Sequence, residues 1–133
     1  MDGIIDTLQD RGDCNQFLKA MNETNYFEII NGKGPYTVFA PVDEAFSNFS
    51  KEDLAKLFEN KSRLADMISE HVVVGLYETG DLEKTDEVVN LNNRGLATEL
   101  HGEGLIVGGA KITESDIRCT DGIIQIVDLV LLP

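Results

Sequence analysis

The chain has 133 residues, of which 42% are apolar and 26% are charged. This composition excludes a disordered segment, and the length suits one globular domain with its own hydrophobic core. No repeat, low-complexity tract or linker divides the sequence, so we expect a single domain over residues 1–133. The formal net charge of −13 repels phosphates, which argues against nucleic acids and anionic membranes as partners.

Neither a membrane anchor nor a metal site is predicted. No apolar run is long enough to span a bilayer, so direct membrane insertion is not expected. The start, MDGIIDTLQDRGD, lacks the basic-then-apolar order of a signal peptide, although a mature form or an excised domain would look the same. The acidic residues do not follow the spaced Asp/Asn–Gly pattern of a calcium loop, so we expect no metal and no cofactor.

The first half of the chain is expected to be helical. Apolar spacing predicts short helical segments around residues 4–8, 17–21 and 26–30. Gly12 is expected to end the first segment, and Asp13 to cap the second. A turn over 31–35 should follow the third segment.

A strand over 36–40 is then expected to end at Pro41. Val42 or Asp43 should begin a helix of one to two turns. Ser50 and Asp53 resemble a capping box that opens the next helix. The apolar residues from Leu64 to His71 have the spacing of one helical face, so a further helix is predicted there.

The second half has the two-residue period of strands. Strands are predicted at 88–91, 96–100, 105–107, 111–113, 117–120 and 123–132, with turns at 92–95, 102–104, 108–109 and 121–122. The last strand is apolar almost throughout, which is typical of a strand that is covered on both faces. Helices followed by a mostly antiparallel sheet make an α+β domain.

Three blocks of the sequence occur in a fixed order: TVFAPVDEAF (37–46), SEHVVVGLY (69–77) and DIRCTDGIIQIVDLVLLP (116–133). A strand running through Ala-Pro into an acidic helix, a helix ending in His-Val-Val, and a terminal strand after Asp-Gly together resemble the fasciclin-like (FAS1) domain, a module of extracellular adhesion proteins. The resemblance covers nearly the whole chain. It implies a helical N-terminal half packed on a mostly antiparallel two-sheet β-wedge.

Two residues depart from the family pattern. The hydroxyl residue that usually follows Ala-Pro is Val42 here, so Asp43 is expected to serve as the N-cap instead. Gln125 stands where family members commonly have a histidine. Gln125 keeps a donor and an acceptor but cannot titrate, so a structural hydrogen bond would survive the change and a proton switch would not.

His71 is expected to be a buried residue whose ring donates a hydrogen bond to a backbone carbonyl near the end of its helix. The resemblance implies a second role, because the segment around the matching histidine is implicated in integrin contact in animal members. The segment from Ser69 to Tyr77 inherits that hypothesis, with His71 and Tyr77 as candidate contact residues. A buried ring, however, cannot touch a receptor.

Asp116 and Ile117 match an Asp-Ile pair that some animal members use for integrin recognition just before the last hairpin. An exposed carboxylate there could complete the coordination of a receptor-bound cation, with Ile117 filling a small pocket. The alternative is that Asp116 caps a turn while Ile117 packs inward.

Arg11, Gly12 and Asp13 spell the well-known integrin tripeptide. The local interpretation competes with it, because Gly12 is suited to end one helix and Asp13 to cap the next. A capping carboxylate would already be engaged with backbone N–H groups.

Cys14 and Cys119 are too few for a disulfide framework and too far apart in sequence for a metal knuckle. A disulfide between them would close a loop of about one hundred residues and contribute roughly 4 kcal/mol in the chain-entropy model. Equally, both could be buried thiols that act as small hydrophobic side chains.

N-glycosylation sequons begin at Asn22, Asn48 and Asn60. Composition alone would give about one, so their number supports an extracellular or cell-surface location in an organism that glycosylates asparagine.

An enzyme is not expected. The chain has no nucleophile elbow and no clustered metal ligands, and Pro35 interrupts the only glycine-rich loop that could cradle a phosphate. The favoured function is adhesion through a cell-surface or matrix protein or a glycan. The alternatives are a soluble carrier of a small apolar ligand, which needs a concave apolar pocket, and a structural spacer within a longer surface protein.

Overall fold

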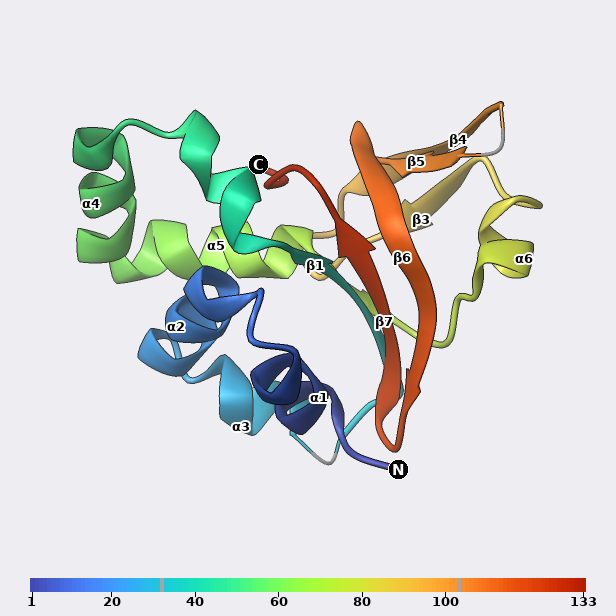
Figure 1. The fold of residues 1–133 in the computed structure, drawn as a ribbon, viewed down its shortest axis with the longest axis horizontal. Coiled ribbons are helices and arrows are strands. Elements are labelled where there is room, and N and C mark those ends of the chain that lie inside the picture. The colour runs from blue at the N-terminus through green and yellow to red at the C-terminus, as the bar shows by residue number, and fades with distance from the viewer. Residues whose placement is uncertain (32, 103) are drawn as a thin grey trace.

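The computed structural model describes residues 1–31, 33–102 and 104–133. Figure 1 shows helices α1 to α5 gathered on one side of the molecule, and the sheet with α6 on the other. In chain order the elements are α1 (Ile4–Arg11), α2 (Asn15–Glu23), α3 (Tyr26–Ile30), β1 (Tyr36–Pro41), the 3-10 helix η1 (Asp43–Asn48), α4 (Lys51–Glu59), α5 (Lys61–Glu70), β2 (Val72–Val74), α6 (Thr79–Leu82), β3 (Glu87–Val89), β4 (Gly95–His101), β5 (Gly104–Val107), β6 (Ala110–Cys119) and β7 (Gly122–Val127).

The strands form one seven-stranded sheet in the order β2-β1-β7-β6-β5-β4-β3, so the predicted division into two sheets is wrong. Most neighbouring strands are antiparallel, as expected. Strands β1 and β7 instead run parallel, with Tyr36 opposite Gly122 and Pro41 opposite Val127. Parallel neighbours require a long connection, and here every element from η1 to β6 lies between them in sequence.

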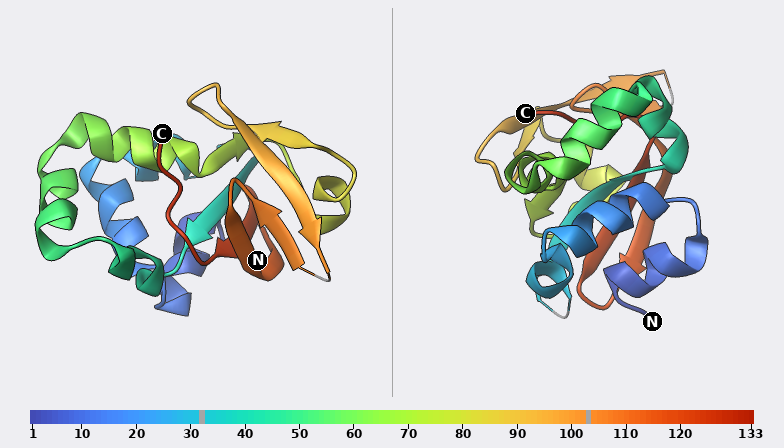
Figure 2. Two further views of the ribbon diagram at one scale, coloured as in Figure 1. Left: turned by 90° about the horizontal axis from the view of Figure 1, so that it is seen from above. Right: turned by 90° about the vertical axis from the view of Figure 1, so that its left-hand side faces the viewer.

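The two edges of the sheet approach each other, so the sheet curls toward a closed barrel (Figure 2). Val73 of β2 and Asn90, just after β3, form an isolated antiparallel bridge. Beside it, the Leu91 N–H donates to the Val72 carbonyl at 2.9 Å. These contacts occupy backbone groups that an open sheet would leave as free edges.

The core consists of two clusters on opposite faces of the central strands. The larger joins α1, α2, α5 and η1 to β1 and β7, and includes Phe17, Met67 and Ile124. The smaller lies inside the curl of the sheet, around Phe39 and Val107. Strand β7 lies between the clusters and is buried along its whole length, which confirms that its apolar run is covered on both faces.

Several predicted strand limits are wrong. Residues 111–113 and 117–120 belong to one ten-residue strand, β6, whose register against β7 shifts twice between Ile112 and Ile117. Strand β7 ends at Val127 and does not continue to Leu132. The sequence also missed β2 and α6. The predicted turns over 31–35 and 102–104 each include a residue, Gly32 or Glu103, outside the described ranges.

The helix caps follow the prediction in part. Gly12 ends α1 with a φ of 75°, and the Ser50 side chain accepts the Asp53 N–H at 3.0 Å. Asp13, however, does not cap α2. That role falls to Asp43, whose carboxylate accepts the Gln16 N–H at 2.7 Å, so Asp43 does not cap its own helix η1.

None of the helices in the described part of the chain combines the length and the apolar character needed to cross a membrane.

Candidate partner-binding site

Asp116 lies in β6, in the stretch where the register shifts, and has a left-handed backbone with φ 59°. It does not lie in a loop before the last hairpin. Its Oδ1 accepts the Thr79 N–H at 2.8 Å, and its Oδ2 accepts the Thr79 hydroxyl at 2.7 Å. Because Thr79 is the first residue of α6, Asp116 holds the start of that helix against β6.

Gln125 of β7 completes this network from the other side. Its Nε2 donates to Asp116 Oδ1 at 2.9 Å and to the Tyr77 carbonyl at 3.1 Å. Its Oε1 accepts the Asp116 N–H at 2.9 Å. Gln125 is fully buried, so its donor and its acceptor both serve internal hydrogen bonds. We call Tyr77, Thr79, Asp116 and Gln125 the bulge network.

The charge on Asp116 is stabilised by this network. Partial burial favours the neutral acid, but the hydrogen bonds from Gln125 and Thr79 outweigh it and keep the pKa of Asp116 below its usual value. The carboxylate is therefore ionised at neutral pH and already occupied by donors from its own chain. Ile117 is partly buried against the larger core cluster. Ile117 therefore packs inward, as the alternative expects, whereas Asp116 binds the start of α6 from within β6 and does not cap a turn.

Tyr77 and His71, the other candidate contact residues, are also engaged internally. Tyr77 is partly buried against the smaller cluster, and its N–H donates to the Thr37 hydroxyl at 2.9 Å. His71 is fully buried. Its Nδ1 donates to the Met67 carbonyl at 2.8 Å, as predicted, and its Nε2 accepts the Leu131 N–H at 2.9 Å.

The His71 ring is neutral. Burial lowers its pKa to about 4, because a charged imidazole without water would be poorly solvated, although the bond to Met67 opposes this shift. The two hydrogen bonds tie the C-terminal segment to the end of α5. The ring is thus a structural connector without a surface of its own.

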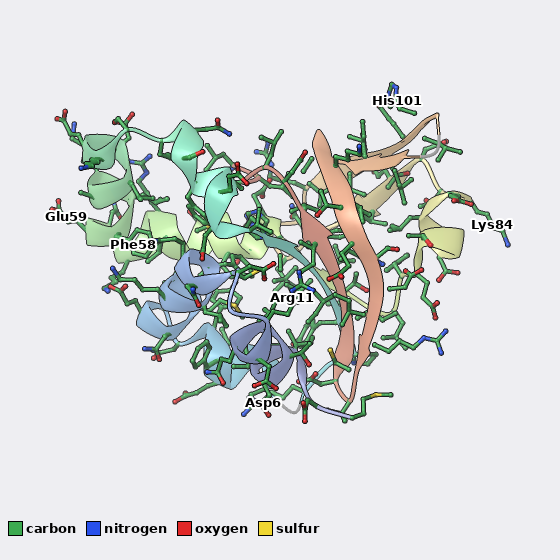
Figure 3. All side chains as sticks on the ribbon, viewed as in Figure 1. Asp6, Arg11, Phe58, Glu59, Lys84 and His101 are labelled. Carbon is green, nitrogen blue, oxygen red and sulfur yellow. The ribbon has the colours of Figure 1, made fainter. Side chains whose placement is uncertain are left out.

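The Arg11-Gly12-Asp13 tripeptide folds back on itself. The Arg11 guanidinium donates to both oxygens of Asp13, at 3.1 and 2.8 Å, and a further nitrogen pairs with Glu114 of β6. Hydrogen bonding to Arg11 is the main cause of the lowered pKa of Asp13. Arg11 lies on the side of the helices that faces the sheet (Figure 3), and its pair with Glu114 connects α1 to β6.

Cys14 and Cys119 are free, buried thiols in the structure and form no disulfide with each other there. Burial raises the pKa of Cys14 to about 12, with the negative charge of Asp13 adding to the effect. The pKa of Cys119 is also raised by burial. Thiols with such pKa values form little thiolate at neutral pH and react slowly.

The three sequon asparagines, Asn22, Asn48 and Asn60, are all exposed. Asn60 also caps α5, because its side-chain oxygen accepts the Arg63 N–H at 3.1 Å. This bond leaves the amide nitrogen, which would carry the glycan, free of the cap.

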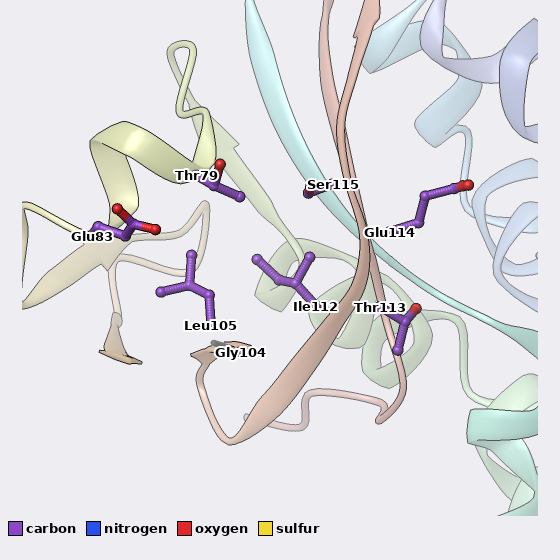
Figure 4. Close-up of a pocket in the computed structure, with 8 residues that line it drawn as sticks. All are labelled: Thr79, Glu83, Gly104, Leu105, Ile112, Thr113, Glu114 and Ser115. Carbon is purple, nitrogen blue, oxygen red and sulfur yellow. The ribbon is translucent and has the colours of Figure 1, made fainter. Parts of the chain in front are cut away.

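An open groove of about 500 Å³ lies beside the bulge network, between α6, β5 and β6 (Figure 4). Glu83, directly after α6, Leu105 of β5 and Ile112 of β6 point into it. It is lined by Thr79, Glu83, Gly104, Leu105, Ile112, Thr113, Glu114 and Ser115. Sequence reasoning missed this groove, because α6 is only four residues long and carries no apolar period. The Glu78–Asp81 pair, which forms a capping box at α6, is the one local signal that could have revealed the helix.

No group of three or more His, Cys, Asp or Glu side chains within the described ranges is arranged to hold a metal ion.

The model of the fasciclin domain family matches residues 12–133. The chain therefore belongs to the fasciclin domain family. Among solved structures it is similar to a FAS1 domain pair from the insect cell adhesion molecule Fasciclin I, with a TM-score of 0.72 and 17% identity over 92% of this chain and 46% of that one. At this identity the likeness shows the fold alone.

Three relatives differ in length and in name. The chain is 29% identical to the uncharacterized protein sll1735 of Synechocystis over 99% of this chain and 98% of that protein. It is 28% identical to the rabbit transforming growth factor-beta-induced protein ig-h3, covering 98% of this chain but only 19% of the rabbit protein. A Plasmodium falciparum protein named heme ligase is 27% identical over 94% of this chain and 73% of its own length.

Proposed function

We propose that this protein is a non-catalytic interaction module of the cell surface or extracellular space, which binds a protein partner at the groove between α6, β5 and β6. Membership of the fasciclin family and the likeness of the fold to a domain pair of a cell adhesion molecule support this function. The exposed sequons Asn22, Asn48 and Asn60 agree with an extracellular location.

The observation that carries the choice of site is the contrast between the bulge network and its surroundings. The side chains that resemble adhesion motifs, Asp116 and those of the Arg11-Gly12-Asp13 tripeptide, bind partners within the chain. The groove beside them is open, and combines the apolar side chains of Leu105 and Ile112 with the carboxylate of Glu83. A mixed apolar and polar concavity supported by rigid strands suits a protein ligand.

The carrier alternative is placed second for a physical reason. A carrier would enclose its apolar ligand, whereas this groove is open to solvent and lined mainly by polar residues. The spacer alternative predicts a domain that binds nothing.

Binding of the folded domain to a panel of cell-surface and matrix proteins and glycans, by biolayer interferometry, tests the proposal. We expect saturable binding to at least one protein, lost when the domain is unfolded. Binding to glycans alone would replace the protein partner with a glycan, and no binding above background would contradict the proposed function.

A further inference from the structure

We infer that the groove accepts an extended peptide segment as an added strand on the open edge of β6. This inference rests on the proposed function and specifies the kind of partner surface that it requires. The partner segment is extended, offers alternate backbone amides to β6, and carries a basic side chain opposite Glu83.

The first observation is the unequal length of two neighbouring strands. Strand β5 has four residues and β6 has ten. In the part of the chain that the structure describes, their ladder contains only the pairs Ile106–Lys111 and Val107–Ala110. Beyond Lys111, β6 continues to Cys119. Over this stretch, β7 is its only strand partner among the described residues. An unpaired strand edge is a template for another extended chain.

The second observation is independent of the ladder. The groove of about 500 Å³ lies along this same stretch, and Thr113, Glu114 and Ser115 of β6 contribute to its wall. An edge covered by side chains could not accept another strand. Here the groove runs beside these residues, and Thr79 and Glu83 line it from the α6 side (Figure 4).

The charges of the groove indicate which peptide fits. Glu114 is neutralised by Arg11 and points away from the groove. Glu83 is exposed, and its carboxylate makes no side-chain hydrogen bond or ion pair with another described residue. With a net charge of −13 on the whole chain, the groove favours a basic residue at this point. Ile112, which is partly exposed, supplies apolar contact for an alternate side chain of the same segment, and the buried Leu105 supports it from the core.

The bulge limits the length of the site. At Asp116 the left-handed residue and its bonds to Thr79 close the open edge at one end. The ladder with β5 closes it at the other end, at Lys111. A short segment therefore fits, and long strand-to-strand association between two such domains does not.

The test uses a pool of acetylated and amidated heptapeptides, in which Val or Thr alternates with randomised positions around a central Lys. We expect the domain to retain members of the pool, and the amide NMR signals of Leu105, Thr113 and Ser115 to shift on binding. Two N-methylated versions of each retained peptide, with methyl groups on odd or on even amides, act as controls. A strand that pairs along one edge uses alternate amides, so only one version should lose binding.

The charge is tested with Glu83→Lys, which should weaken binding at least about tenfold because it places like charges together. Glu59→Lys is the matched control at the far end of α4 (Figure 3) and should bind as the wild type does. The inference is overturned if no peptide is retained, if the shifts lie elsewhere, or if both methylated versions bind as well as the parent. A domain that binds a panel protein but retains no peptide would keep the proposed function and lose this inference.

Discussion

At the scale of single residues, His71 links the stability of the domain to pH. Its folded-state pKa is about 4, below the ordinary value of 6.5. Between these values the unfolded chain binds a proton that the folded chain does not. The stability is therefore complete above pH 6.5 and falls as the pH drops toward 4, by about 3 kcal/mol at about 1.4 kcal/mol per pKa unit.

We predict that His71→Gln flattens this fall between pH 6.5 and 4.5, because glutamine takes up no proton. Urea unfolding, followed by circular dichroism at several pH values, measures how the free energy of unfolding depends on pH. His101→Gln is the control, since His101 is exposed and pairs only with Glu99 in the structure described. Equal slopes for the wild type and His71→Gln would contradict a buried neutral ring.

Asp116 offers a second test at this scale. Asp116→Ala removes the three hydrogen bonds that the carboxylate accepts. It also places alanine, which has no polar side chain, at a positive φ. We therefore expect the free energy of unfolding to fall by about 2–3 kcal/mol. Asp116→Asn keeps one acceptor oxygen and tolerates the backbone, and should cost about 1 kcal/mol. Urea unfolding at pH 7 measures both variants. Similar stabilities for the Ala variant and the wild type would contradict the bulge network.

At the scale of elements, some helix contacts are made by neighbouring residues and others by residues far apart in the sequence. Gly12 and Ser50 act within their own turns, and their roles are predictable from neighbouring residues. Asp43 caps a helix that begins 28 residues earlier, and Arg11 pairs with Glu114 across 103 positions. Such contacts depend on tertiary packing, which no local pattern encodes.

The same distinction explains the errors in the sheet. The alternation of apolar residues predicts most strands, but it does not indicate which strands become neighbours in the sheet. Closure of the sheet depends on Asn90, a polar residue buried at the seam, and the strand predicted around it gives no indication of its partner Val73. The groove depends on the mismatch between β5 and β6 and on α6, so it could not be predicted either.

For the helix caps we predict that Asp43→Ala lowers the stability by about 1 kcal/mol, because the Gln16 N–H loses its acceptor. Asp13→Ala should cost less than about 0.5 kcal/mol, since its main partner is the partly exposed Arg11. Thermal unfolding of the two variants side by side measures the difference. A larger loss for Asp13→Ala would restore it as the cap of α2.

At the scale of the whole molecule, the reactivity of the two thiols tests whether the helical half and the sheet unfold together. Cys14 precedes α2 in the helical half and Cys119 ends β6, yet both belong to the larger core cluster. We predict two free thiols per chain after denaturation without reductant. Both should react with a thiol reagent only at the rate of global unfolding. Zero free thiols would show that the two cysteines are bonded, and fast labelling of one alone would show that its half opens separately.

We propose that partners bind at the open groove, and not at Asp116 or the Arg11-Gly12-Asp13 tripeptide. The direct measurement compares Ser115→Tyr, which fills the groove, with Ser47→Tyr on η1, in binding to the partner that the panel selects. Both serines are exposed, so both variants should fold. We expect at least about a tenfold loss of affinity for Ser115→Tyr and none for Ser47→Tyr. Unchanged binding by Ser115→Tyr would contradict this proposal.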